Sequence, residues 1–231
     1  MMALAGLLVL EWGLYISCFV CGIVTAASVT IVQGNFGGRC MLYGAVSYNA
    51  TSKVIGVQSF TSSSLCYFVS AISIMVAVVC FSLSVYWVYT FCSEGELKRE
   101  NVWMNVIIAV SGVFLFFLLV TGCMLKIGRD TLCSSVTKNV PNTTSCEKAQ
   151  SEKWAGPLDG KRFYSSLHKA ETAVWINFFF WLIIGVLVII QRRRGSGSKL
   201  IEAAPTGSLF GETGVTPEET EPFFNRPGRP Q

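Results

Sequence analysis

The sequence has few charged residues for its length, and it has a single histidine. Charged residues make up 14% of the 231 positions, whereas soluble globular domains carry about 25%. This shortage argues against a soluble enzyme. The net charge of +4 is small and scattered, which excludes the concentrated basic surface of a nucleic-acid-binding protein. One histidine and no clustered carboxylates also leave little for hydrolytic chemistry.

Four long stretches contain no Asp, Glu, Lys or Arg, and each is long enough to cross a bilayer as a helix, which takes about 20 mostly apolar residues. They are residues 12–38, 54–93, 101–125 and 172–191. The sequence therefore predicts an all-α membrane protein, a bundle of four transmembrane helices. We predict spans at 12–32, 67–91, 102–125 and 172–190, separated by an N-terminus (1–11), a first loop (33–66), a hairpin (92–101), a second loop (126–171) and a disordered tail (191–231).

The predicted spans also contain no proline and no Asp, Glu, Lys, Arg or His. Pumps and ion-coupled transporters usually place such costly charges, or broken helices, inside the membrane. A protein of that class is therefore not expected. Glu11 borders the first span, and we expect an interfacial carboxylate there. The alternative is that Glu11 pairs with Lys98 or Arg99 across the bundle.

Lys and Arg are distributed too evenly to orient the chain, but two glycosylation sequons favour one orientation. Asn49-Ala-Thr51 lies in the first loop and Asn142-Thr-Thr144 lies in the second. Because N-glycosylation takes place on the luminal side, these sequons predict glycans at Asn49 and Asn142, luminal or extracellular loops and cytosolic termini. An alternative makes the first span a signal peptide cleaved near Ala26-Ala27, which would leave three spans.

Cysteine usage agrees with this orientation. The first loop holds Cys40 and Cys66, and the second holds Cys133 and Cys146. An even number in each loop suits disulfides formed in an oxidising compartment. Pairing within each loop is the simplest of the three possible connectivities, and the other two stay open.

The loops are expected to form a small, disulfide-stapled and partly β luminal cap, a name used here for residues 33–66 and 126–171. Residues 41–48 and 53–60 are rich in β-formers, and residues 49–52 between them form a plausible turn. The pattern predicts a β-hairpin with the first sequon at its tip. At the end of the second loop, residues 163–171 are predicted to be a helical run into the fourth span.

Cys18-x-x-Cys21 in the first span resembles a redox or metal pair, but zinc takes four ligands. We favour a face of small residues for close helix packing, made of this pair with Ser17, Gly22 and Ala26.

Three further cysteines lie in or beside the second and third spans. Cys80 and Cys123 are expected to be buried thiols. Cys92 is a candidate for palmitoylation, with an unmodified interfacial cysteine as the alternative.

His168 and Glu171 are three residues apart, so they share a face of a helix. A catalytic role would need a nucleophile or a metal beside them, and the sequence nominates none. We therefore expect a contact surface here. The chain has no phosphate loop and no dinucleotide fingerprint after a strand, so no cofactor is expected.

Several four-span families can be compared with the chain. Claudins carry a tryptophan-bearing motif before the cysteine pair of their first loop, and this first loop has no tryptophan. Tetraspanins carry a Cys-Cys-Gly triplet in a large second loop, and this second loop has neither. On these motifs, the chain resembles both families in topology only.

A closer resemblance is to the transmembrane protein 179 family, B-type branch. It is carried in order by Gln33-Gly-Asn-Phe-Gly-Gly-Arg-Cys40, Leu42-Tyr-Gly44, Leu65-Cys-Tyr-Phe-Val69, Leu132-Cys-Ser134, Phe163-Tyr-Ser-Ser-Leu-His168, Ala170-Glu-Thr172 and Trp175-Ile-Asn177. The resemblance implies a four-span protein of the plasma membrane and secretory-granule membranes, with cytosolic termini and loop cysteines paired outside. It implies no reaction. The matching positions gather at the luminal ends of the spans and nominate a contact surface of Arg39, Tyr43, Tyr67, His168 and Glu171.

The sequence therefore predicts a non-enzymatic tetraspan organiser or accessory protein. It would act through helix packing and luminal contacts with other membrane proteins in the bilayer, and a homo-oligomer is compatible with this function. One alternative is a channel or auxiliary channel subunit, which would need several copies because the spans offer no polar lining. Another is a membrane enzyme that uses His168 and Glu171.

Overall fold

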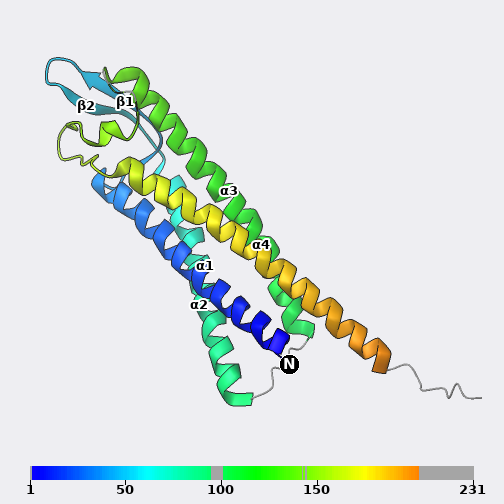
Figure 1. Ribbon diagram of the computed structural model, residues 1–231. Helices are drawn as coiled ribbons and strands as arrows, with labels where there is room; N and C mark the ends of the chain where they lie inside the picture. The colour runs from blue at the N-terminus through cyan, green and yellow to red at the C-terminus, as the bar shows by residue number, and fades with distance from the viewer. Residues whose placement is uncertain (1, 95–100, 142, 144, 203–231) are drawn as a thin grey trace, which may run out of the picture. The chain divides into compact units, whose positions relative to one another are not determined.

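The structure is a computed structural model that describes residues 2–94, 101–141, 143 and 145–202. The chain divides into two compact units, residues 1–194 and residues 195–231. The account below concerns the first unit, and the described part of the second is the end of the last helix. Residues 191–202 are helical, which corrects the prediction of a disordered tail from residue 191. The elements are α1 (Met2–Asn35), β1 (Cys40–Asn49), β2 (Val54–Thr61), α2 (Ser63–Glu94), α3 (Asn101–Asn139), the 3-10 turn η1 (Lys148–Gln150) and α4 (Phe163–Glu202) (Figure 1).

All four α-helices are long and apolar enough to cross a membrane. Their outer surfaces carry large apolar side chains, and Val78, Phe116 and Phe179 are each more than half exposed. Helices that are apolar all round are characteristic of membrane spans. The predicted four-helix membrane fold with a small two-stranded sheet is confirmed.

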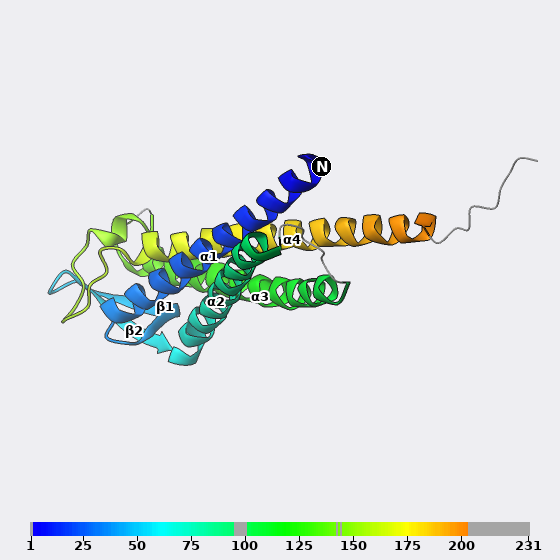
Figure 2. The ribbon, with the colours of Figure 1, turned by 90° about the horizontal axis from the view of Figure 1, so that it is seen from below.

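Aromatic and small side chains together form the core of the bundle. The indole of Trp181 is fully buried and meets the rings of Tyr15 and Phe114 edge to face, at 6.2 and 4.9 Å between centroids. Two turns further along α1, Gly22 is buried against Ala77 of α2, as the predicted face of small residues requires. Figures 1 and 2 show α1 and α2 lying side by side.

The side chain of Glu11 is fully buried within the bundle, and its place at the membrane interface stays a prediction. It accepts a hydrogen bond from the Tyr15 hydroxyl at 2.9 Å and one from Gln191 Nε2 of α4 at 3.4 Å. The bundle therefore surrounds this carboxylate with polar partners from two helices. Lys98 and Arg99, the partners considered from the sequence, lie outside the described residues.

The cap contains the predicted hairpin, in which β1 and β2 pair antiparallel and Asn49 is opposite Val54. The hairpin is also attached to α3. The Val46 N–H donates to Ser135 Oγ at 3.0 Å, and Asn139 Nδ2 donates to the Val46 carbonyl at 2.8 Å. These bonds satisfy the backbone polar groups of Val46, which point away from β2.

Helix α3 continues well beyond Leu125, where the third span was predicted to end. The charges that begin at Lys126 suggested a loop. However, Leu132 and Val136 continue an apolar stripe at four-residue spacing, and both are fully buried in the cap. The helix continues because the cap gives that stripe a core to pack against.

The core of the cap is centred on Trp154, whose ring lies 5.3 Å from Phe36 and 5.4 Å from Phe163 between centroids. Its segment also extends the sheet, because the Ile55 N–H donates to the Lys153 carbonyl at 2.8 Å. The predicted helical run into the fourth span is part of α4, which begins at Phe163.

Two disulfides close the cap. Cys40–Cys66 joins the start of β1 to the start of α2, and Cys133–Cys146 joins α3 to the segment that follows it. These are the within-loop pairings, the simplest of the connectivities that the sequence allowed.

The other cysteines are free. Cys80 is buried as expected, whereas Cys123 is exposed on the outer surface of α3. The expectation of a buried Cys123 thiol was therefore wrong: the uncharged span gave no indication of which face the lipid covers.

Candidate functional site

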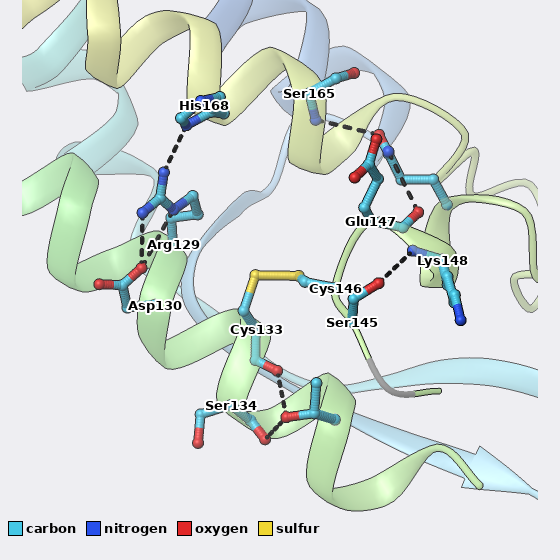
Figure 3. Close-up of a disulfide and its surroundings, with 12 residues drawn as sticks. Arg129, Asp130, Cys133, Ser134, Ser145, Cys146, Glu147, Lys148, Ser165 and His168 are labelled. Carbon is cyan, nitrogen blue, oxygen red and sulfur yellow. Dashed lines mark hydrogen bonds and ion pairs between the residues drawn. A yellow bond between two sulfur atoms is a disulfide. The ribbon is translucent and has the colours of Figure 1, made fainter. Parts of the chain in front are cut away.

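A compact group of charged side chains lies where α3 and α4 enter the cap. We call it the Arg129 cluster, and it consists of Arg129, Asp130, His168 and Glu171. Figure 3 shows Arg129 reaching from α3 between Asp130 and His168, close to the Cys133–Cys146 disulfide.

Arg129 is the centre of this cluster. Its Nη1 forms an ion pair with Glu171 Oε2, and its Nη2 lies 2.9 Å from Asp130 Oδ1. The side chains of Arg129 and Glu171 are only 13% and 11% exposed. A buried carboxylate is costly unless it is paired, so Arg129 makes the burial of Glu171 possible.

Arg129 also fixes the ring of His168, because Arg129 Nη1 donates to His168 Nδ1 at 2.9 Å. A guanidinium has no acceptor, so Nδ1 of His168 is the acceptor in this hydrogen bond, and Nε2 is the ring nitrogen that can donate. The ring stacks on Tyr164, with centroids 6.0 Å apart and an interplanar angle of 5°. The guanidinium lies over the same Tyr164 ring at 5.9 Å. Arg129 and Tyr164 therefore hold the imidazole ring of His168 in one orientation, while 57% of the His168 side chain is exposed.

This geometry indicates that the Arg129 cluster joins α3 to α4 and leaves the imidazole of His168 exposed. The Glu171 carboxylate is engaged by Arg129, and the distance from its Oε2 to His168 Nδ1 is 4.0 Å, too long for a hydrogen bond. Within the part of the chain that the structure describes, no three His, Cys, Asp or Glu side chains are placed to hold a metal ion.

The five residues nominated from the sequence do not form one cluster. Arg39 lies over the ring of Phe60 in the hairpin, with Cζ 4.9 Å from its centroid. Tyr43 has a positive φ of 61° and packs towards α3, whereas Tyr67 on α2 is 61% exposed. Among the described residues, only His168 and Glu171 of these five belong to one contact network, through Arg129.

Arg129 itself was not nominated, because the sequence placed it in a loop among other basic residues. The spacing of apolar residues along a helix could have placed Arg129 on α3. Leu125, Leu132 and Val136 continue a buried face past the predicted span, and Arg129 lies on the same helix. Tyr164 precedes His168 by four residues, the spacing of neighbours on one helical face.

The hairpin tip presents the first sequon in an ordered turn. The Oδ1 atom of Asn49 accepts hydrogen bonds from the backbone N–H groups of Thr51 at 2.9 Å and Ser52 at 3.3 Å. Asn49 is exposed. Asn142 and Thr144 of the second sequon lie outside the described residues. Cys92, at the opposite end of α2, is exposed.

Four apolar spanning helices and a disulfide-bonded cap with a two-stranded sheet define a tetraspan membrane protein. A family model described as the transmembrane protein 179/179B claudin domain matches residues 7–220. The chain belongs to the transmembrane protein 179/179B family. The family resemblance found in the sequence is confirmed, and the description implies a closer relation to claudins than topology alone suggested.

Three curated relatives are similar over most of the chain, and each is called transmembrane protein 179B. The zebrafish (Danio rerio) protein is 60% identical and covers 99% of this chain and 100% of its own length. The human protein is 38% identical and the mouse protein 36%, each covering 82% of this chain and 85% of its own length. No solved structure matches the chain.

Proposed function

We propose that the chain is a non-enzymatic tetraspan organiser or accessory protein, which binds other membrane proteins through its helices and its cap. The observation that carries this proposal is that the spanning helices α3 and α4 continue into the cap, whose parts are bonded together around them. Val46 is bonded to Ser135 and Asn139 of α3, and Arg129 of α3 pairs with Glu171 of α4. Because such a surface is already ordered, a partner that binds it loses little conformational entropy to the cap.

The orientation that fits this function places the cap in the lumen or outside the cell and both termini in the cytosol. Two disulfides in the cap support it, since such bonds persist in oxidising compartments. The exposed Asn49 at the hairpin tip supports it as well, as a glycan acceptor. The family resemblance suggests residence in the plasma membrane and secretory-granule membranes, and Cys92 would be a palmitoylation site on the cytosolic side.

The lateral surface offers a place for a partner helix. Near the end of the bundle opposite the cap, α1 and α2 border an apolar groove of about 490 Å³. Aromatic and β-branched side chains form most of its walls, so a partner helix would find a large apolar contact area there. The lining residues are Trp12, Ile16, Phe19, Phe81, Ser84, Val85, Val88 and Tyr89.

Partner capture with surface variants tests the proposal. Full-length chain with a tail epitope would be crosslinked in cells, purified and analysed by quantitative mass spectrometry. We expect His168→Ala or Tyr67→Ala to remove partners of the cap, and Ile16→Trp to remove partners of the groove. Ile74→Trp is the matched control, because Ile74 is 49% exposed and does not line the groove.

Variants that keep every partner at unchanged surface levels would contradict the proposed function. A conductance measured from purified, reconstituted chain would instead support the channel alternative.

A further inference from the structure

A second groove lies between α1 and α4, at the level where α4 enters the predicted fourth span. Its volume of about 410 Å³ falls within the range of ligand sites in proteins. We call it the α1–α4 groove. It is lined by Val20, Cys21 and Val24 of α1 and by His168, Lys169, Thr172, Ala173 and Ile176 of α4.

The walls of this groove are apolar below its mouth. Val20 and Ile176 are 51% and 41% exposed, so they face the hydrocarbon chains of the bilayer. Thr172 adds no free donor, because its hydroxyl donates to the His168 carbonyl at 2.9 Å. The apolar walls of the groove are therefore suited to contact with an acyl chain.

The mouth of the groove differs from its walls, because it presents two hydrogen-bond donors. His168 accepts at Nδ1 from Arg129, so its Nε2–H is directed away from that bond. Lys169 is exposed beside it. The neighbouring carboxylates of Asp130 and Glu171 are both bound to Arg129, so in the described part of the chain no carboxylate neutralises Lys169.

The order of these features along α4 matches the cross-section of a membrane. His168 and Lys169 come immediately before the uncharged run 172–191, at the level of the lipid headgroups. Thr172, Ala173 and Ile176 follow within the hydrocarbon region. A lipid with its phosphate at the mouth would have polar donors beside its headgroup and apolar side chains beside the first part of one acyl chain.

We propose that the α1–α4 groove binds an anionic phospholipid, with Lys169 and His168 Nε2 donating to its headgroup. Lys169 selects for the net negative charge, and the imidazole, fixed by Arg129, donates to a phosphate oxygen. This site shares His168 with the partner surface proposed for the cap, so its tests use Lys169 and Val24, which are not part of that surface.

Photolabelling of the full-length chain tests the site. The purified chain would be placed in phosphatidylcholine nanodiscs that contain phosphatidylserine with a photoactivatable diazirine in one acyl chain. After irradiation, peptide mass spectrometry locates the adducts. We expect them on residues 20–24 and 172–176. Lys169→Gln should lower their yield about fivefold, the equivalent of about 1 kcal/mol per basic group at an anionic surface, and Lys169→Arg should preserve it.

Two matched controls make the result specific. Lys161→Gln removes an exposed lysine elsewhere in the cap and should leave the yield unchanged. Val24→Phe should block the groove, whereas Ile23→Phe, at an exposed position that does not line it, should not. Adducts spread evenly over the four helices, an unchanged yield in Lys169→Gln, or equal labelling by photoactivatable phosphatidylcholine would overturn the proposal. Displacement of the probe by a sterol or by a bound protein helix would overturn it as well.

Discussion

Gly22 of α1 and Ser73 of α2 are so close that a Cβ atom on Gly22 would lie 2.8 Å from the Ser73 carbonyl oxygen. The same atom would lie 3.1 Å from the Cβ of Ala77. Helices associate in lipid largely by close packing, and small residues allow their backbones to approach. The contact between α1 and α2 therefore depends on the absence of a side chain at position 22.

Enlarging this position should separate the two helices. We expect Gly22→Leu to destabilise the folded protein by about 2 kcal/mol, since an overpacked site forces the backbone to shift. Thermal unfolding of the detergent-purified chain would measure the loss. Gly13→Leu on the same helix is the control, because nothing lies within 4 Å of a Cβ atom there. Equal melting temperatures for the two variants would contradict the inferred close contact.

Removing Arg129 should destabilise the junction between the bundle and the cap. Arg129→Leu leaves the Glu171 carboxylate buried without its ion pair, and such a loss costs about 3 kcal/mol. The double variant Arg129→Leu/Glu171→Leu should recover much of this stability, because an apolar pair requires no compensating charge. A double-mutant cycle on unfolding free energies checks the coupling. Additive effects of the two substitutions would show that the ion pair contributes nothing.

The disulfides should stabilise the cap mainly by restricting the unfolded chain. Cys40 and Cys66 are 26 residues apart, and the loop-entropy relation gives about 3.5 kcal/mol for a loop of that length. We expect Cys40→Ala/Cys66→Ala to lower the unfolding free energy by about that amount. Limited proteolysis should then cleave the hairpin sooner. Cys123→Ala, at an exposed free thiol, is the control and should change neither measurement.

The first sequon should carry a glycan, which a glycosidase-shift gel would detect. Thr51→Ala removes the sequon but keeps the backbone N–H that Asn49 Oδ1 accepts, so the turn should persist while the shift is lost. Thr51→Ser preserves the sequon and should preserve the shift. The same gel on Asn142→Gln and on the double variant Asn49→Gln/Asn142→Gln would show how many of the two sites carry a glycan. If no site is occupied and a tail epitope is reached from outside intact cells, the proposed orientation is inverted.

Local sequence patterns were sufficient for most of the architecture. Uncharged runs predict four spanning helices, because each charge in lipid is costly. The β-rich residues 41–48 and 53–60 predict a hairpin that the structure has as Cys40–Asn49 and Val54–Thr61. Such features depend on neighbours within a few positions, so a single sequence contains them.

The features that could not be predicted depend on residues far apart in the chain. The buried Glu11 accepts a hydrogen bond from Gln191, which is 180 positions away. Arg129 meets His168 across 39 positions, and only because α3 continues into the cap. Basic residues after an apolar run usually mark the end of a spanning helix. In α3 they mark the point where one continuous helix passes from the predicted span into the cap.

The length of α3 has a mechanical consequence. Its 39 residues extend about 58 Å, whereas the hydrocarbon core of a bilayer is about 30 Å thick. The β-hairpin is bonded to Ser135 and Asn139 in the part of α3 that projects from the membrane. The hairpin therefore moves with α3 whenever this helix rotates. The part of α3 beyond Leu125 has 14 residues and extends about 21 Å past the predicted span. Spanning helices respond to thinner membranes by tilting, and a tilt of about 20° displaces a point about 21 Å beyond the span sideways by about 7 Å. A change in membrane thickness thus becomes a lateral displacement of the hairpin.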